Sequence, residues 1–79
     1  MRLDKFLKVS RVIKRRTVAN EACDAGRVMI NGRVAKASTE VKIDDIVEIK
    51  YGEKTIKFKI KSITSLVTKE DALEMIEMI

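Results

Sequence analysis

Residues 10–32, SRVIKRRTVANEACDAGRVMING, constrain the fold of this chain more than any other stretch. Asn31 and Gly32 separate Val28–Ile30 from Arg33–Val34. An Asn-Gly pair in such a setting is the strongest short signal for a β-hairpin, because both turn residues accept positive φ. Gly26 precedes the hairpin and suits the left-handed residue that ends a helix. The stretch therefore predicts a helix that leads directly into a tight hairpin.

A first helix is expected over residues 3–9, because Leu3, Phe6 and Leu7 lie at helical spacing and form one apolar face. Ser10 is expected to end it. Val12 and Ile13 are then expected to anchor the following connection to the core, with its charges facing outward.

Thr17 is a favourable N-cap residue and predicts a second helix over residues 18–25. Val18, Ala22 and Ala25 share one face of this helix, with Ala19 and Cys23 beside them, and these small residues predict close packing of that face against the first helix.

The second half of the chain predicts strands. A turn at residues 43–46 leads into a strand over residues 46–50, and a turn at residues 51–54 leads into a strand over residues 55–61. The last strand alternates, with inward residues Ile56, Phe58 and Ile60 and outward residues Lys57, Lys59 and Lys61. The lysine row could contact nucleic acid, but protection of a sheet edge against aggregation is the favoured explanation.

A final helix is expected over residues 69–78, with Thr68 as N-cap and Glu70 and Asp71 in its first turn. Its apolar residues would cover the core. Recruitment of a partner protein by this acidic helix is the alternative.

Positive charge is concentrated in the first half of the chain. Residues 1–36 contain ten Lys and Arg against three acids, a net +7, whereas residues 37–79 contain seven Lys against nine acids, a net −2. All six Arg lie in the first 33 residues. Because Arg binds phosphate bidentately and stacks on bases, an Arg-rich half of a small domain indicates nucleic-acid binding.

The composition argues against several other classes. Without His, a Ser-His or Cys-His nucleophile system is excluded, and the three scattered Gly residues do not form a phosphate loop. One Cys excludes an internal disulfide and leaves a zinc site without enough ligands. No apolar run approaches the roughly 20 residues of a membrane span, and the charged N-terminus lacks the apolar region of a signal peptide. The sequence predicts a cytoplasmic protein that is not an enzyme and needs no cofactor. It carries no signal for an oligomeric state, and a monomer is the default expectation.

The two helices could form a DNA-reading unit, but their charges favour structured RNA. The exposed face of the second helix would offer one amide and two acids to a DNA groove: Asn20, Glu21 and Asp24. The basic residues Lys14, Arg15 and Arg16 instead precede that helix, where free N–H groups and the helix dipole also attract phosphate. Such a surface grips a backbone and fits structured RNA, which is recognised through its shape, phosphates and 2′-hydroxyls.

Asp4 is the only acid among the first twenty residues. Its place in the first turn suits the helix dipole, which is the favoured explanation. The alternative is that Asp4 pairs with Arg2, Arg11 or Arg16 and orients a guanidinium for RNA.

One combination of residues carries a family resemblance: Arg2, Leu3, Asp4, Ser10, Arg11, Arg16, Thr17, Ala22, Gly26, Val28, Asn31, Gly32, Val41 and Asp45. It resembles the S-four (S4) RNA-binding domain over roughly residues 1–52, with Asp44 where the family commonly has Gly. The resemblance implies an α+β fold in which two N-terminal helices pack on a bent antiparallel β-sheet, the alpha-L motif. We expect a single domain over residues 1–79, with an S-four-like core over about 1–52 and a sheet extension and short C-terminal helix over 53–79.

A free-standing chain that opens with MRLDKFLKVSRVIKRRT is also similar to a family of bacterial ribosome-associated quality-control proteins, relatives of heat-shock protein fifteen. This resemblance implies binding to large ribosomal subunits that hold a peptidyl-tRNA, through contacts with 23S rRNA and tRNA. It also implies cooperation with a factor that recruits alanyl-tRNA and extends the stalled chain with alanines. Ribosome recycling or assembly is the alternative task for an RNA-binding factor of this kind.

By position, the resemblance implies that Arg2, Arg11 and Arg16 are the central RNA-contacting residues. Lys14 and Arg15 would support them electrostatically, and Lys5 and Lys8 would add weaker contacts. The complete expected RNA-binding set is Arg2, Asp4, Lys5, Lys8, Arg11, Lys14, Arg15, Arg16 and Arg33.

Overall fold

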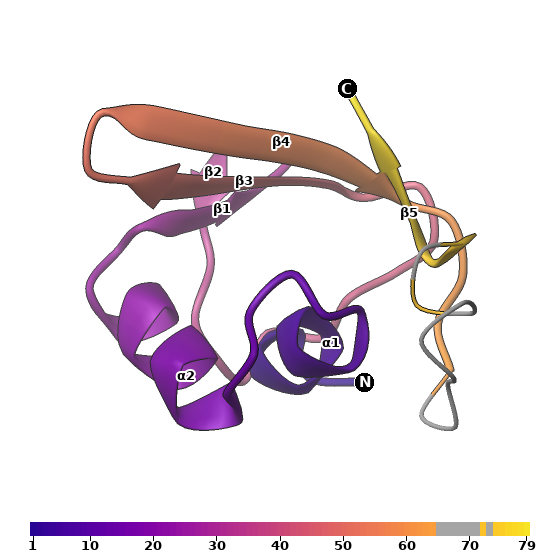
Figure 1. Ribbon diagram of the computed structural model, residues 1–79, viewed down its shortest axis with the longest axis horizontal. Helices are drawn as coiled ribbons and strands as arrows, with labels where there is room; N and C mark the ends of the chain where they lie inside the picture. The colour runs from indigo at the N-terminus through magenta and orange to yellow at the C-terminus, as the bar shows by residue number, and fades with distance from the viewer. Residues whose placement is uncertain (65–71, 73) are drawn as a thin grey trace.

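The computed structural model describes residues 1–64, 72 and 74–79. Its elements are α1 (Leu3–Val9), α2 (Arg16–Asp24), β1 (Val28–Ile30), β2 (Arg33–Val34), β3 (Ile46–Tyr51), β4 (Lys54–Ile60) and β5 (Ile76–Met78). The strands form one antiparallel sheet in the order β2-β1-β3-β4-β5, and both helices lie against one side of it (Figure 1). This two-layer α+β architecture is the expected one.

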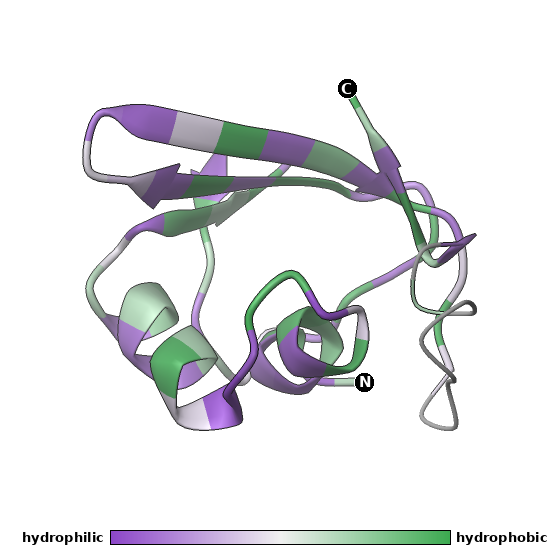
Figure 2. Cartoon of the chain, viewed as in Figure 1, coloured by the Kyte–Doolittle hydropathy of each residue, from purple (hydrophilic) through white to green (hydrophobic). Residues whose placement is uncertain are grey.

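The core lies between the helices and the sheet. The expected apolar face of α1 is confirmed, since Leu3, Phe6 and Leu7 are all fully buried. Figure 2 shows hydrophobic and hydrophilic residues alternating along β4, and its inward residues Phe58 and Ile60 are also fully buried. Each such side chain contributes about 1.5–3 kcal/mol on removal from water. The helical layer, which carries most of the expected site residues, is therefore fixed to the sheet by aliphatic and aromatic packing.

The end of α2 and the following hairpin form as the sequence predicts. Gly26 has a φ of 73°, and the backbone N–H groups of Gly26 and Arg27 donate to the carbonyls of Cys23 and Ala22. This pattern is a Schellman motif, which a left-handed residue makes possible. In the hairpin, Asn31 and Gly32 have φ values of 52° and 81°, so both turn residues are left-handed as expected.

The start of α2 differs from the prediction. The helix begins at Arg16, after an extended Arg15 that provides no side-chain cap, so Thr17 lies in the first turn and is not the N-cap. The buried face also differs, because Ala19 is fully buried whereas Val18 is 44% exposed. The small Ala19 side chain faces the core, while the larger Val18 remains at the surface.

The strand β4 is not a free edge along its whole length. β5 pairs with β4 from Phe58↔Met78 to Ile60↔Ile76. Protection of a sheet edge therefore does not explain Lys59, whose Nζ atom lies 3.5 Å from Oδ1 of Asp44.

Part of the expected C-terminal helix is wrong. Residues 65–71 and 73 lie outside the described part of the chain, and residues 72 and 74 are helical. Residues 76–78, however, form strand β5. The backbone of β4 offers hydrogen-bond partners to this segment, and strand pairing prevails there over helix formation. Among the described residues, no helix is long and apolar enough to cross a membrane.

Candidate nucleic-acid interface

The residues before α1 are held by the connection between β2 and β3. Leu3 N–H donates to the carbonyl of Thr39 at 2.7 Å, and Val41 N–H donates to that of Met1 at 3.0 Å. Between them, Arg2 forms an isolated antiparallel bridge with Glu40. This pairing fixes the backbone from which the exposed Arg2 side chain projects.

The basic loop between the helices is anchored to the core. Ile13 is only 5% exposed, and its N–H donates to the carbonyl of Leu7. Lys14 and Arg15 are exposed beside it. Arg11 occupies the left-handed region with a φ of 63°, a conformation that L residues other than Gly rarely adopt. The prediction that buried anchors alternate with outward charges is confirmed.

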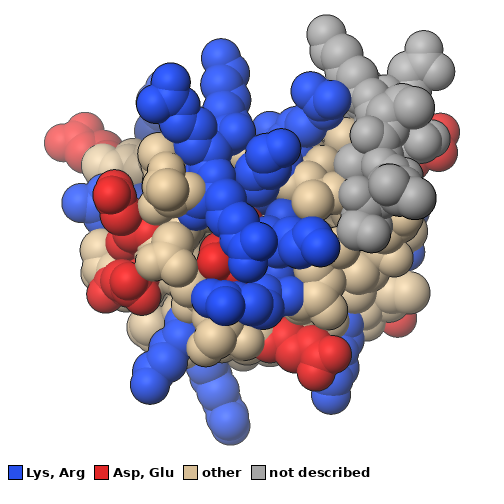
Figure 3. Space-filling model, turned by 90° about the horizontal axis from the view of Figure 1, so that it is seen from below, with Lys and Arg blue, Asp and Glu red and all other residues tan. Residues whose placement is uncertain are grey.

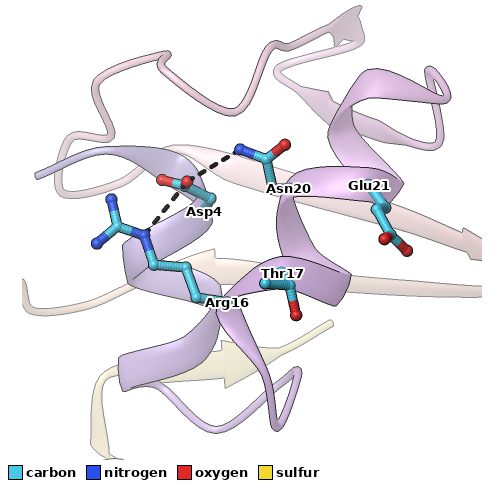
Figure 4. Close-up of a pocket in the computed structure, with 5 residues that line it drawn as sticks. All are labelled: Asp4, Arg16, Thr17, Asn20 and Glu21. Carbon is cyan, nitrogen blue, oxygen red and sulfur yellow. Dashed lines mark hydrogen bonds and ion pairs between the residues drawn. The ribbon is translucent and has the colours of Figure 1, made fainter.

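Asp4 lies at the centre of a group of four donors. Its carboxylate accepts hydrogen bonds from Nη2 of Arg2 at 3.4 Å, Nε of Arg16 at 3.3 Å, Nδ2 of Asn20 at 3.3 Å and the backbone N–H of Lys5 at 2.8 Å. The Nε atom of Arg2 also lies 3.3 Å from Oδ1. Figure 4 shows Arg16 and Asn20 converging on Asp4 from α2. Asp4 therefore orients two arginines, as the alternative explanation of its role predicted.

The carboxylate of Asp4 is buried yet ionised. Burial alone would raise its pKa. The hydrogen bonds from Asn20, Arg16 and the Lys5 backbone N–H, together with the positive charge of Arg16, lower the pKa by more than burial raises it. The net result is a pKa below the ordinary value of 3.8. Asp4 thus carries a full negative charge at neutral pH and holds both guanidinium groups in place.

The arginines keep donors available for a ligand. Arg16 contacts Asp4 through its Nε atom. Within the described part of the chain, neither terminal nitrogen of Arg16 forms a hydrogen bond or an ion pair. The Arg2 and Arg16 side chains are 51% and 47% exposed, whereas that of Asp4 is 3% exposed. A guanidinium that is fixed at Nε and open at its terminal nitrogens is prepared for bidentate binding of phosphate.

Positive side chains surround this group on the helical face. Figure 3 shows that face, with Lys and Arg gathered over its centre and acidic side chains mainly near its margins. The terminal nitrogens of Arg16 and the neighbouring cations therefore present donors to a polyanion. Beside them, a shallow hollow of about 390 Å³ is lined by Asp4, Arg16, Thr17, Asn20 and Glu21.

The expected site residues divide into three groups. Arg2, Asp4 and Arg16 are joined directly, with the backbone of Lys5. Others are exposed along α1 and the loop after it: Lys8, Arg11, Lys14 and Arg15. Arg33 is exposed on the edge strand β2, and no recorded ion pair or hydrogen bond of the described residues connects it to Asp4.

Asn20 belongs to the group but is absent from the expected RNA-binding set. Its Nδ2 atom donates to Oδ2 of Asp4. A signal was present in the sequence, since Asn20 follows Arg16 by four positions and so lies on the same helical face. That face could be recognised only after Arg16 was placed inside the helix.

Comparison with known proteins matches residues 1–47 to the S4 domain. A Streptococcus pneumoniae protein named RQC P-site tRNA stabilizing factor is 53% identical over 79 residues, covering 100% of this chain and 90% of that protein. A Halalkalibacterium halodurans protein of the same name is 51% identical over 78 residues, covering 99% of this chain and 89% of that protein.

A solved structure of Vibrio cholerae heat shock protein 15, described as trimeric, superimposes with a TM-score of 0.91 at 28% identity. It covers 100% of this chain and 81% of that one. These matches confirm the fold and both resemblances found in the sequence. Because the S4 domain covers more than half of the chain and the relatives match almost all of it, the chain belongs to the S4 domain family that includes the RQC P-site tRNA stabilizing factors.

Proposed function

We propose that this chain is an RNA-binding factor of ribosome-associated quality control, which stabilises peptidyl-tRNA in the P site of a stalled large ribosomal subunit. The relatives that match the whole chain bear the name RQC P-site tRNA stabilizing factor. The observation that carries the proposal is the buried Asp4 carboxylate, which orients Arg2 and Arg16 on a basic face. A face of this kind grips RNA phosphates in a fixed geometry.

The helical face would act by positioning RNA and not by chemistry. Arg2 and Arg16 would each bind a phosphate through their outward guanidinium nitrogens, and Arg11 would bind a further phosphate. Lys14 and Arg15 would raise the local positive potential. The remaining cations of the expected set, Lys5, Lys8 and Arg33, would add weaker contacts to rRNA or tRNA.

The wider setting follows from the same proposal. The domain would act in the cytoplasm, on ribosomal RNA and tRNA together. It would cooperate with a second factor that recruits alanyl-tRNA, so that a stalled chain receives an alanine tail. By holding the tRNA in the P site, it would favour each further addition over release of the tRNA.

Co-sedimentation at near-physiological salt tests the function. The samples are empty large subunits, large subunits that carry peptidyl-tRNA, and whole ribosomes. The wild-type chain is expected to prefer the complex with peptidyl-tRNA, and Arg16→Ala is expected to remove that binding. Lys54→Ala is the matched control, because it also removes one exposed positive charge but lies on β4, in the sheet layer.

Two other outcomes would contradict the proposal. Equal binding to empty subunits and to the peptidyl-tRNA complex would favour recycling or assembly. An equal loss of binding in Arg16→Ala and Lys54→Ala would show that net charge, and not the geometry at Asp4, determines the interaction.

A further inference from the structure

The hollow beside Asp4 has a different chemistry from the rest of the basic face. It lies along the first turns of α2 and is lined by Asp4, Arg16, Thr17, Asn20 and Glu21 (Figure 4). Its volume of about 390 Å³ falls in the range of small-ligand sites. One end therefore holds a cation, and the other holds a carboxylate that would repel phosphate.

The hydrogen-bonding groups of the hollow are partly fixed by Asp4. Because Nδ2 of Asn20 donates to Asp4, the amide oxygen of Asn20 points away from Asp4, as Figure 4 shows. Glu21 is exposed, and its carboxylate has no recorded hydrogen bond or ion pair with any described residue. Thr17 precedes Glu21 by one helical turn and adds a hydroxyl group on the same side. The hollow thus offers the amide oxygen of Asn20 beside Asp4, and the carboxylate of Glu21 with the hydroxyl of Thr17 at its far end.

A nucleotide satisfies both ends of this arrangement. Its phosphate would bind the terminal nitrogens of Arg16, and its base would reach the acceptors. A carboxylate accepts two hydrogen bonds at once from adjacent donors. Among the four RNA bases, only guanine has two adjacent donors on its Watson–Crick edge, N1–H and the 2-amino group. Single-stranded RNA presents that edge to proteins, whereas a duplex hides it.

We propose that this hollow binds one unpaired guanosine of the RNA, with its phosphate on Arg16 and its Watson–Crick edge on Glu21. The site rests on the proposed function, because it deepens the RNA recognition assigned to the same face. Asn20 positions the site through Asp4 and offers its amide oxygen to the ribose or the base. Glu21 thereby determines which base is bound, while the cations of the basic face attract RNA phosphates whatever the sequence.

Nuclear magnetic resonance with the isotopically labelled full chain tests the site. The probes are guanosine, inosine and adenosine 5′-monophosphates, added separately to millimolar concentration. Guanosine monophosphate should shift the amide signals of Thr17, Asn20 and Glu21 and bind at least roughly fivefold more tightly than adenosine monophosphate. Inosine monophosphate, which lacks the 2-amino group, should bind with intermediate affinity.

Glu21→Gln separates recognition from simple charge. Removal of a negative charge next to a phosphate site should strengthen binding of all three nucleotides if electrostatics alone operates. Direct recognition predicts that the preference for guanosine monophosphate disappears instead. Asp24→Asn is the matched control, since it makes the same charge change on an exposed residue of α2 that does not line the hollow. The same spectra show whether each variant is folded.

The proposal is overturned if guanosine and adenosine monophosphates bind equally, if neither shifts these signals, or if the two variants behave alike. This failure differs from failure of the proposed function. If co-sedimentation with the peptidyl-tRNA complex still depends on Arg16, the function stands without the guanosine site. If the nucleotide preference is present and co-sedimentation is absent, the site stands and the function does not.

Discussion

The Nε atom of Arg16 lies 3.3 Å from Oδ2 of Asp4, although twelve positions separate the two residues in the chain. The contact joins the first residue of α2 to the first turn of α1. Because Asp4 is buried and Arg16 is half exposed, the pair fixes one part of the guanidinium and leaves the rest at the surface. The negative charge of Asp4 therefore orients a cation on a face that is suited to binding negatively charged ligands.

Replacement Asp4→Asn provides a test in which charge and geometry predict opposite results. The variant gains one unit of positive charge, which alone would tighten RNA binding. Loss of the carboxylate releases Arg2 and Arg16, so we expect weaker binding to the peptidyl-tRNA complex. Stability should fall by about 1–3 kcal/mol, because charged hydrogen bonds to a buried group are lost. Co-sedimentation and urea unfolding measure the two effects.

Asp24→Asn is the control for that variant. It makes the same change in charge at an exposed residue of α2. Binding should stay the same or become slightly tighter. If Asp4→Asn also binds more tightly, the orienting role of Asp4 is refuted.

Acid unfolding should report the ion pairs of Asp4. Its pKa in the folded chain lies below the ordinary value of 3.8. The stabilisation is therefore complete above pH 3.8 and is lost as the pH falls through the lower pKa of the folded state, since the unfolded chain binds the proton first. The difference in unfolding free energy between wild type and Asp4→Asn should become smaller as the pH falls from 3.8 through the lower pKa of Asp4 in the folded chain. A constant difference in urea titrations at several acidic pH values would contradict this prediction.

Local signals in the sequence were sufficient for much of the fold. The spacing of Leu3, Phe6 and Leu7 predicted α1, and Gly26 and the Asn-Gly turn predicted the end of α2 and the hairpin. Each of these depends on neighbours within a few positions. The family resemblance and the charge distribution then indicated which face would bind RNA.

The errors arose where distant segments decide the structure. Strand β5 forms because residues 76–78 meet the edge of β4, and no pattern within residues 69–78 reveals that partner. The first residue of α2 is likewise Arg16, whose side chain is held by Asp4 from another helix. Asn20 was missed for the same reason, because its role depends on the distance between α1 and α2 in space.

Arg11→Gly should separate stability from binding. Arg11 has a φ of 63°, and a left-handed conformation costs an L residue roughly 1–2 kcal/mol. Glycine removes this cost but makes the unfolded chain more flexible, which offsets part of the gain. Since Arg11 is exposed, we expect unchanged or increased stability with weaker RNA binding. The slope of log affinity against log salt should decrease by about 0.9.

Arg11→Ala is the comparison, because it removes the same charge and keeps the backbone strain. It should weaken binding equally without any gain in stability. If Arg11→Gly is clearly less stable than wild type in urea unfolding, the strain at this position is not relieved by glycine and the prediction is wrong.

Asp44→Gly should stabilise the chain without changing RNA binding. Asp44 stands where the family commonly has Gly, and its φ of 75° shows that the turn keeps the left-handed conformation. Its ion pair with Lys59 is solvent-exposed, with side chains 76% and 40% exposed, and pairs of this kind contribute little. Relief of the backbone cost, less the offset from a more flexible unfolded chain, should raise stability by at most about 1 kcal/mol, which corresponds to a rise in melting temperature of at most roughly 4–8 °C for a domain of this size.

Asp44→Asn serves as the control for that change, because Asn tolerates the left-handed region but cannot form the ion pair. Its stability should remain within about 0.5 kcal/mol of wild type, as for most surface substitutions. If both variants lose stability, the ion pair with Lys59 matters more than the backbone conformation. If only Asp44→Gly gains stability, the wild-type turn before β3 carries a backbone strain that glycine relieves. This turn contains none of the residues that bind the Asp4 carboxylate.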